Sequence, residues 1–392
     1  MTTGTTRRTQ RWAITALVTA TTLLAAACVM PPPPAAGVDP DLAPQAGDAA
    51  YTEPGPYPVG VTTLALADRE VEVWYPADAA GIGTTPRDEY FIRDFVPPAF
   101  DALIPASVNP PYVTNAYRSV PAASDGPFPL AIFSHGAASF RLQSSELTTH
   151  LASWGFVVIS PDYFERGLTS VLGASPATPR ADTVVADEAI ELARAASAEP
   201  ASLLSGVVAP GDVYPFGHSA GGGTSLRLLS RPDVRAIVPM ASGILGLSIL
   251  NGSAPPLPAD KSVFWMGGQN DGIANIDNVR TGYAYTAGQK KILELAKTGH
   301  NNAFTDICEI GEGGVAELAI ATGLPIPPSL LNLGNDGCPA PPFRESAQVW
   351  PEVKHFLTAE FRYRAGLDAE PVGLGTQVTA SFDDVARYEH AP

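Results

Sequence analysis

The sequence predicts an α/β fold, in which a doubly wound and mostly parallel sheet is flanked by crossover helices. Short continuous apolar runs, the pattern of strands buried on both faces, alternate with helical patterns along the middle of the chain. Hydrophobic residues make up 45% of the 392 residues and charged residues only 16%, so one sizeable core can form. This composition excludes a disordered chain and a coiled coil.

The predicted strands and helices follow one another in the order that builds a parallel sheet. Strands are expected at residues 69–75, 128–133, 156–159, 213–216, 236–240, 261–266 and 292–296. Helices are expected at residues 143–154, 181–196, 220–230 and 345–364. Because strands joined by helical crossovers pair in parallel, we expect one domain over residues 51–365 and a C-terminal extension over 366–392.

The first fifty residues have the features of an export signal and a tether. An arginine-rich start precedes an uncharged apolar stretch, residues 12–27, which is too short and wrongly flanked for a typical membrane span. We therefore expect a signal peptide at 1–27 and an exported bacterial protein, either secreted or on the cell surface. Small residues before Cys28 resemble a bacterial lipobox. Cys28 is therefore expected to be acylated and to anchor the chain to a membrane. The alternative is an ordinary secretory signal that ends by chance in a cysteine. The Pro- and Ala-rich residues 28–50 are predicted to form a tether.

Charge and motif content exclude several classes of protein. The formal net charge is −16, with 24 basic against 40 acidic residues, which argues against a nucleic-acid partner. The sequence contains no GxGxxG fingerprint, no P-loop, and no CxxC or HExxH motif. Dinucleotide chemistry, nucleotide hydrolysis and a zinc site are therefore not expected, and no cofactor or metal is predicted.

Cys308 and Cys338 are predicted to form a disulfide. Exported proteins fold in an oxidising compartment, where paired cysteines persist. Both cysteines lie in one Gly- and Pro-rich stretch, and in the chain-entropy model a cross-link over such a loop contributes roughly 3–4 kcal/mol. The alternative is two unpaired buried thiols.

The clearest chemical motif is Gly217-x-Ser219-x-Gly221, which stands between a predicted strand and a predicted helix. This is the nucleophile-elbow pattern, in which small residues allow a strained turn that exposes the serine hydroxyl at a helix N-terminus. We therefore predict Ser219 as a nucleophile and the α/β-hydrolase fold as the architecture. The alternative is a plain glycine-rich turn, which the strand before the motif and the helix after it make less favourable.

A serine hydroxyl needs a base within hydrogen-bond reach, and His300 is the histidine in the expected place. The chain order of an α/β-hydrolase triad is serine, acid, histidine, and His300 follows a late strand in a loop. The other histidines fall in the elbow, on helices, in an early loop or in the C-terminal tail. The acid should follow the preceding strand, where Asp271 stands, with Asp277 as the competing carboxylate. The alternative for His300 is a surface loop histidine.

Negative charge that develops on a substrate carbonyl requires fixed backbone N–H donors. One donor is expected to be the amide of Ala220, the residue after the nucleophile. The other is expected to be the amide of Ala137, in the loop after the predicted strand 128–133, where Gly136 allows the backbone to turn.

Four motifs resemble the platelet-activating-factor acetylhydrolase family. They are FSHGAASFR from Phe133, WGFVV from Trp154, GHSAGG from Gly217 and HNNAFTD from His300. The resemblance covers about residues 55–365. It implies calcium-independent hydrolysis of esters, by Ser219, Asp271 and His300 and through an acyl-enzyme, with short-acyl or oxidised phospholipids and small esters as substrates. The small Ala137 and Ala220 stand where vertebrate members carry bulkier residues, so the acyl preference is open.

Other functions compete with this interpretation. The layout is also similar to bacterial cutinase-like polyester hydrolases, which makes a polyester or triglyceride hydrolase the alternative among enzymes. Dienelactone hydrolases share the wider fold, but a cysteine nucleophile would then be expected. A hypothesis of another class is a catalytically silent lipoprotein that uses the fold to bind a partner, and the complete set of serine, aspartate and histidine argues against it.

Two long loops, residues 78–125 and 303–345, are candidate walls of the site. Their apolar side chains include Tyr90, Phe91, Phe95, Phe100, Leu324, Ile326, Leu330 and Leu331. As an entrance they would favour amphiphilic esters; alternatively, the aromatic residues only pack their loop onto the domain. Closure of these loops over the site and the oligomeric state are left open by the sequence.

Overall fold

The computed structural model describes Met1 and residues 47–174, 178–242 and 257–391. The chain divides into two units, Met1–Val38 and Asp39–Pro392, and the fold belongs to the second unit. The predicted signal peptide apart from Met1, together with Cys28 and most of the predicted tether, lies outside the described residues. Residues 49 and 50, at the end of that tether, pack against the core.

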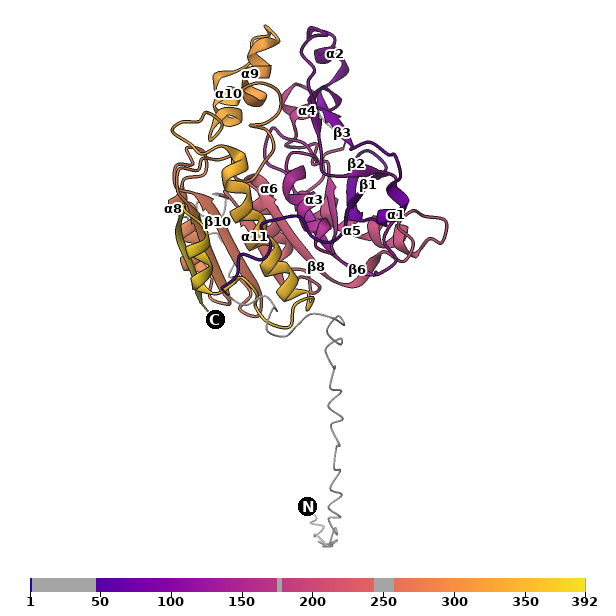
Figure 1. The fold of residues 1–392 in the computed structure, drawn as a ribbon, viewed down its shortest axis with the longest axis vertical. Helices are drawn as coiled ribbons and strands as arrows, with labels where there is room; N and C mark the ends of the chain where they lie inside the picture. The colour runs from indigo at the N-terminus through magenta and orange to yellow at the C-terminus, as the bar shows by residue number, and fades with distance from the viewer. Residues whose placement is uncertain (2–46, 175–177, 243–256, 392) are drawn as a thin grey trace. The chain divides into compact units, whose positions relative to one another are not determined.

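A large sheet runs through the described part of the chain, in the order β12-β11-β10-β9-β8-β6-β7-β2-β1-β5, and a small second sheet pairs β3 with β4 (Figure 1). The strands are β1 (Val59–Ala65), β2 (Glu70–Pro76), β3 (Glu89–Phe91), β4 (Pro111–Val113), β5 (Tyr117–Arg118), β6 (Phe128–Ser134), β7 (Val157–Pro161), β8 (Val208–His218), β9 (Ala236–Met240), β10 (Ser262–Gly268), β11 (Lys290–Leu295) and β12 (Val385–Ala391). Neighbouring strands from β7 to β11 pair in parallel, whereas β2 and β12 join the two sides of this block antiparallel. The predicted α/β fold is confirmed.

The helices connect these strands and cover both faces of the large sheet. They are α1 (Ala79–Ile82), η2 (Ile92–Phe95), α2 (Pro98–Asp101), α3 (Ser145–Ser153), α4 (Leu168–Val171), α5 (Asp182–Ala198), α6 (Ala220–Leu228), α8 (Ile276–Tyr285), α9 (Gly314–Ala321), α10 (Pro328–Asn335), α11 (Ser346–Arg364) and η3 (Thr376–Ser381). Within the described ranges, no helix combines the length and the apolar character that crossing a bilayer would require.

Two hydrophobic clusters form the core, one on each face of the sheet. Side chains alternate along a strand, so in β7 Val158 joins the cluster under α3 and α11, while Val157 and Ile159 join the cluster under α5, α6 and α8. Such strands are buried on both faces, which explains their continuous apolar sequences.

The segment after α11 completes the sheet. Its strand β12 pairs antiparallel with β11 in a register that sets Tyr388 opposite Leu293. Tyr388 is buried, and its hydroxyl donates to the carbonyl of Leu374 at 2.9 Å. The residues predicted as an extension therefore contribute an edge strand and part of the core.

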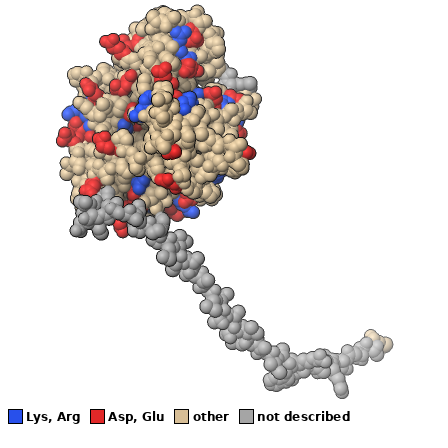
Figure 2. Space-filling model, turned by 45° about the vertical axis from the view of Figure 1, so that its right-hand side comes forward, with Lys and Arg blue, Asp and Glu red and all other residues tan. Residues whose placement is uncertain are grey.

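Acidic and basic side chains are interspersed on the surface. Figure 2 shows both signs scattered over the face that it draws. Many of these residues are paired, as in Arg231 with Asp187 and Asp233, and Arg362 with Asp368.

The fold is expected to lose stability in acid because four of its histidines are buried. Burial lowers the pKa of His135 and His150 to about 3, that of His355 to about 4 and that of His218 well below its ordinary value. Between pH 6.5 and 4.5 these residues are largely neutral in the native state but take up protons when the chain unfolds. Because the unfolded state then binds more protons, the free energy of unfolding falls as the pH falls, by up to about 1.4 kcal/mol per pH unit for each histidine.

Urea unfolding at pH 7.0, 5.5 and 4.5 measures this effect. Asp306, Asp162 and Asp336 act in the opposite direction because burial raises the pKa of each above its ordinary value, but these three carboxyls do not outnumber the four histidines. A free energy of unfolding that stays constant over this range would contradict the expectation.

Candidate active site

Ser219 stands at a sharp turn between β8 and α6. Its backbone adopts φ 55° and ψ −119°, a conformation that costs energy for a residue with a side chain and is found at nucleophile elbows. The flanking glycines are required by close backbone approach: a Cβ on Gly221 would lie 1.8 Å from the carbonyl oxygen of Ser134, and one on Gly217 would lie 2.4 Å from that of Gly221. The half-buried Ser219 is thereby held at the N-terminus of α6.

The structure brings Asp271 and His300 together. They follow β10 and β11, which are parallel neighbours, so the two loops leave the same edge of the sheet. His300 Nδ1 lies 2.8 Å from Asp271 Oδ2, and each side chain is only 1% exposed. The other oxygen, Oδ1, accepts hydrogen bonds from the amides of Ile273 and Ala274 at 2.8 and 2.6 Å. These bonds fix the carboxylate in the orientation that meets the imidazole.

Asp277, the competing carboxylate, is not part of this pair. It lies in the first turn of α8, its side chain is 77% exposed, and it pairs with Arg280 at 2.9 Å. The geometry therefore favours Asp271 as the partner of His300.

His300 and Ser219 line the same cavity. A proton on Nδ1, shared with Asp271, leaves Nε2 of His300 as a buried acceptor, and among the described residues Nε2 has no hydrogen-bond partner. No hydrogen bond joins Ser219 Oγ to Nε2 in the described residues. Such bonds are often long in unliganded sites and tighten when substrate binds.

The amides of Ala137 and Ala220 are both free to donate, since neither makes a hydrogen bond within the described part of the chain. Ala220 is the first residue of α6, where an N–H has no partner inside the helix. The amides on either side of Ala137 are occupied: Gly136 donates to Gln143 Oε1 at 2.8 Å, and Ala138 donates to the carbonyl of Arg166 at 2.7 Å. The loop after β6 is thus pinned on both sides of the predicted donor.

Gln143, which no sequence motif indicates, connects three parts of the site. Its Oε1 accepts from Gly136, and its Nε2 donates to His218 Nδ1 at 2.8 Å. His218 Nε2 then donates to the carbonyl oxygen of His300 at 2.9 Å. Burial, and the neighbouring His300, keep the pKa of His218 well below its ordinary value, so this ring is a neutral connector with a fixed tautomer.

The segment that follows His300 is anchored by polar side chains. Asn301 Nδ2 donates to the carbonyls of Leu333 and Asp336, at 2.8 and 3.0 Å. Asp306 accepts from the amide of Ser145 at 2.6 Å, at the start of α3. The motif that begins at His300 is therefore fixed from α10 at one end and from α3 at the other.

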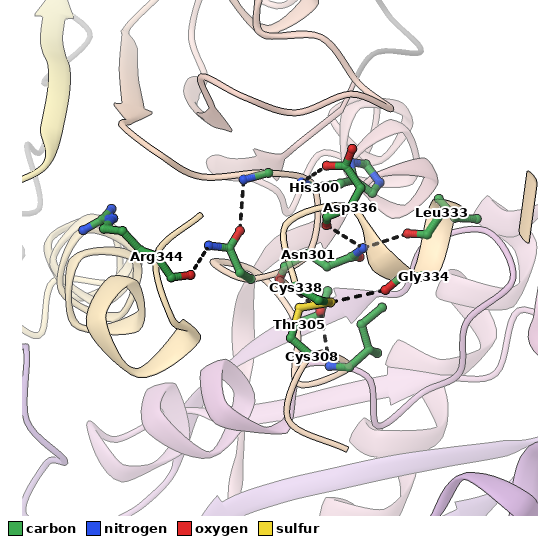
Figure 3. Close-up of a disulfide and its surroundings, with 12 residues drawn as sticks. His300, Asn301, Thr305, Cys308, Leu333, Gly334, Asp336, Cys338 and Arg344 are labelled. Atoms are coloured by element: carbon green, nitrogen blue, oxygen red, sulfur yellow. Dashed lines mark hydrogen bonds between the residues drawn. A yellow bond between two sulfur atoms is a disulfide. The ribbon is translucent and has the colours of Figure 1, made fainter. Parts of the chain in front are cut away.

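The predicted disulfide between Cys308 and Cys338 is present, with the two Cα atoms 4.9 Å apart (Figure 3). It links the segment after His300 to the residues directly after α10. Cys338 is two residues beyond Asp336, whose carboxylate accepts from the backbone amide of His300 at 2.7 Å. The cross-link therefore lies beside the loop that carries the predicted base.

Loss of this disulfide is expected to lower stability and activity. In the chain-entropy model it contributes roughly 3–4 kcal/mol, which corresponds to a fall of several degrees in the unfolding temperature. Activity should fall too, because the cross-link supports the His300 segment. Thermal unfolding with and without reductant measures the first effect, and the paired substitution of Cys308 and Cys338 by alanine is the matched control for reduction. Two freely alkylatable thiols in native protein would contradict the prediction.

A cavity opens at Ser219, and its walls are mostly apolar. They come from η2 and α2, from α4, and from α9 and α10, which gather at one end of the sheet (Figure 1). The apolar lining includes Ile92, Val96, Phe100, Ile104, Leu168, Leu172, Val315, Leu318, Ile326, Leu330 and Leu331. Arg93 is the one charged side chain among the described lining residues, and its Nε donates to Asp101 at 2.6 Å.

Both long loops contribute to this cavity, but not all of their predicted residues do. Phe100 lines it, whereas Tyr90 and Phe95 are buried in the core against Phe140. In the second loop Ile326, Leu330 and Leu331 line the cavity and Leu324 does not. Of these aromatic residues, Phe100 therefore lines the cavity, whereas Tyr90 and Phe95 pack their loop onto the domain.

The large sheet, the elbow and the loops at its edge have the architecture of the α/β-hydrolase fold. The family model for platelet-activating factor acetylhydrolase, isoform II, matches residues 54–172, which supports an ester hydrolase of the phospholipase type. The resemblance predicted from the sequence is confirmed over a segment that includes β6 and the loop of Ala137. No curated protein matches the sequence.

Proposed function

We propose that the protein is a serine carboxylic-ester hydrolase that acts through an acyl-enzyme on short-acyl or oxidised phospholipids and small esters. The observation that carries this proposal is the bond between Asp271 and His300, which leaves His300 Nε2 free beside the apolar cavity that also contains Ser219. The family match over residues 54–172 supports ester hydrolysis as the reaction class.

In the proposed reaction His300 Nε2 takes the proton of Ser219 Oγ as this oxygen attacks the ester carbonyl carbon. The amides of Ala137 and Ala220 donate to the oxyanion, which stabilises the negative charge on the former carbonyl oxygen. His300 then gives its proton to the departing alcohol oxygen, and an acyl group stays on Ser219. His300 next takes a proton from a water molecule as the water oxygen attacks the acyl carbon. The bond from this carbon to Ser219 Oγ breaks, His300 returns the proton to Oγ, and the carboxylic acid leaves.

The walls of the cavity support a preference for neutral, apolar acyl groups. Its lining side chains are mainly aliphatic, and the guanidinium of Arg93 is already held by Asp101 and by the carbonyls of Asp101 and Pro105. Burial of an acyl chain against such walls contributes roughly 25 cal/mol per Å². The small residues Ala137 and Ala220 add no bulk next to the nucleophile.

A series of p-nitrophenyl esters from acetate to palmitate tests the proposal, with a phospholipid bearing a short second acyl chain and a polyester film beside it. We expect kcat/KM to be higher for acetyl to hexanoyl esters than for palmitoyl esters, and to be unchanged by a calcium chelator. A preference for long-chain emulsions with interfacial activation would place the protein among lipases, and preferential release of products from the film would favour a polyester hydrolase.

We also propose that residues 1–27 direct export and that Cys28 carries an acyl anchor. The disulfide between Cys308 and Cys338 supports folding in an oxidising compartment. Metabolic labelling with a fatty acid tests the anchor: label is expected on the wild-type chain and absent after Cys28→Ala. An unlabelled wild-type chain would reject acylation.

A further inference from the structure

The C-terminal end of α10 places a carboxylate between the two loops that carry the predicted acid and base. Asp336 Oδ1 accepts from the backbone amide of His300 at 2.7 Å (Figure 3), and Oδ2 accepts from the backbone amide of Gly272 at 3.1 Å. Gly272 directly follows Asp271 in the sequence. One side chain therefore bridges the loop after β10 and the loop after β11.

Both loops lack a side chain at the positions nearest to this carboxylate. A Cβ on Gly272 would lie 2.6 Å from Asp336 Oδ2, and a Cβ on Gly299 would lie 2.5 Å from Gly337 Cα and 2.8 Å from Asp336 Oδ1. The first substituent would displace the carboxylate, and the second would displace the carboxylate together with the backbone that follows it. The two glycines therefore allow the close approach on which the bridge depends.

Asp336 is itself held firmly. Its amide donates to the carbonyl of Asn332 at 3.1 Å, and its own carbonyl accepts from the amide and the side chain of Asn301 at 3.0 Å each. The disulfide at Cys338 begins two residues further on. Because Asp336 is fixed in this way, its carboxylate can set the distance between the loop after β10 and the loop after β11.

We propose that Asp336 is a positioning residue of the hydrolytic site, which holds the loops of Asp271 and His300 together and stabilises the protonated imidazole by its negative charge. This inference rests on the proposed function of His300 as a base. Within the described residues no hydrogen bond joins Asp336 to the imidazole of His300, so Asp336 acts through the backbone of His300 and through space.

The charge of Asp336 is expected to be felt at the imidazole because few other charges face that ring. Asp271 binds Nδ1 from the loop after β10, and the His218 ring, 4.5 Å away between centroids, is neutral. On the cavity side the charged lining residue is Arg93, which is paired with Asp101. Asp336 is thus the second carboxylate beside His300, and partial burial raises its pKa above the ordinary value.

The test compares Asp336→Asn with Asp336→Glu. The asparagine keeps the shape but removes the charge and replaces one acceptor by a donor, so we expect kcat/KM to fall about tenfold. With the charge gone, the protonated imidazole is less stable, so the acid limb of the pH–rate profile should move to lower pH by about 0.5 to 1 pH unit. The glutamate keeps the charge and should lower the rate while the acid limb stays at its wild-type position.

An NMR titration of the His300 ring protons gives the same shift without an activity assay. Asp277→Asn, an exposed carboxylate-to-amide change in the neighbouring helix, is the control and should leave both the rate and the titration unchanged. A His300 titration in Asp336→Asn that superimposes on the wild type overturns the inference whatever the rate, because an aspartate that only shapes the loop would not move it. Failure of the proposed function is a different result, namely a wild-type protein that hydrolyses no ester.

Discussion

Ser219→Ala is expected to lower kcat by a factor of about 10⁴ or more while the fold stays intact. The proposed reaction forms a covalent bond to Ser219 Oγ, and alanine offers no atom that can take its place. The residual rate would come from the oxyanion amides and from substrate binding alone. Stability should change little, because Oγ makes no hydrogen bond in the described residues and alanine meets the backbone strain at φ 55° as serine does.

Two measurements check this result. A serine-directed phosphonate should label one site in the wild type and none in Ser219→Ala, and the unfolding temperatures of the two proteins should agree. Ser230→Ala is a matched control, since Ser230 lies just beyond the other end of α6 and its hydroxyl donates to the carbonyl of Arg227. Substantial phosphonate-resistant activity in Ser219→Ala would remove Ser219 from the mechanism.

The central strands could be predicted because burial on both faces leaves a continuous apolar sequence. Residues 236–240 are the clearest case, where the predicted and observed strand, β9, coincide. Residues 385–391, by contrast, mix charged and apolar side chains at an edge of the sheet, and the sequence VARYEHA carries no long apolar run. Strand β12 forms because β11 offers an unpaired edge, a condition that local sequence does not record.

Helix α8 is not predicted by the sequence pattern, for a related reason. It buries only Ile276, Val279 and Gly282, and its remaining residues are polar or aromatic apart from Ala284. Such a narrow apolar stripe resembles a polar loop in the sequence. Packing of Ile276 and Val279 against Gly267 of β10 makes the segment helical, and the sequence alone does not show that this surface is available.

The predicted site residues come from motifs whose spacing is local, whereas the supporting residues act across long separations. Gly217-x-Ser219-x-Gly221 is visible because three neighbouring positions must fit one turn. Asp336 meets His300 from 36 residues away and Gly272 from 64 residues away, and Gln143 meets His218 from 75 residues away. An aspartate before a glycine and a glutamine before two serines carry no signal of their own until the fold brings the partners together.

The strongest test of the acid is Asp271→Asn, for which kcat is expected to fall by about 10⁴. Oδ1 of residue 271 accepts from the amides of Ile273 and Ala274, so an asparagine is expected to keep its oxygen there. Its NH₂ group would then point at His300 Nδ1 and require that nitrogen to accept, which places the imidazole proton on Nε2. A ring in this tautomer cannot take the proton of Ser219, so the loss lies in kcat, although the side chain keeps its shape and KM changes little. Asp277→Asn, in the first turn of α8, should retain activity within about twofold, because an exposed side chain paired to Arg280 contributes little. Steady-state kinetics of the two variants decide between the carboxylates. A greater loss of kcat in Asp277→Asn would assign the acid to α8. Full retention of kcat in both variants would show that neither carboxylate is the acid that supports His300.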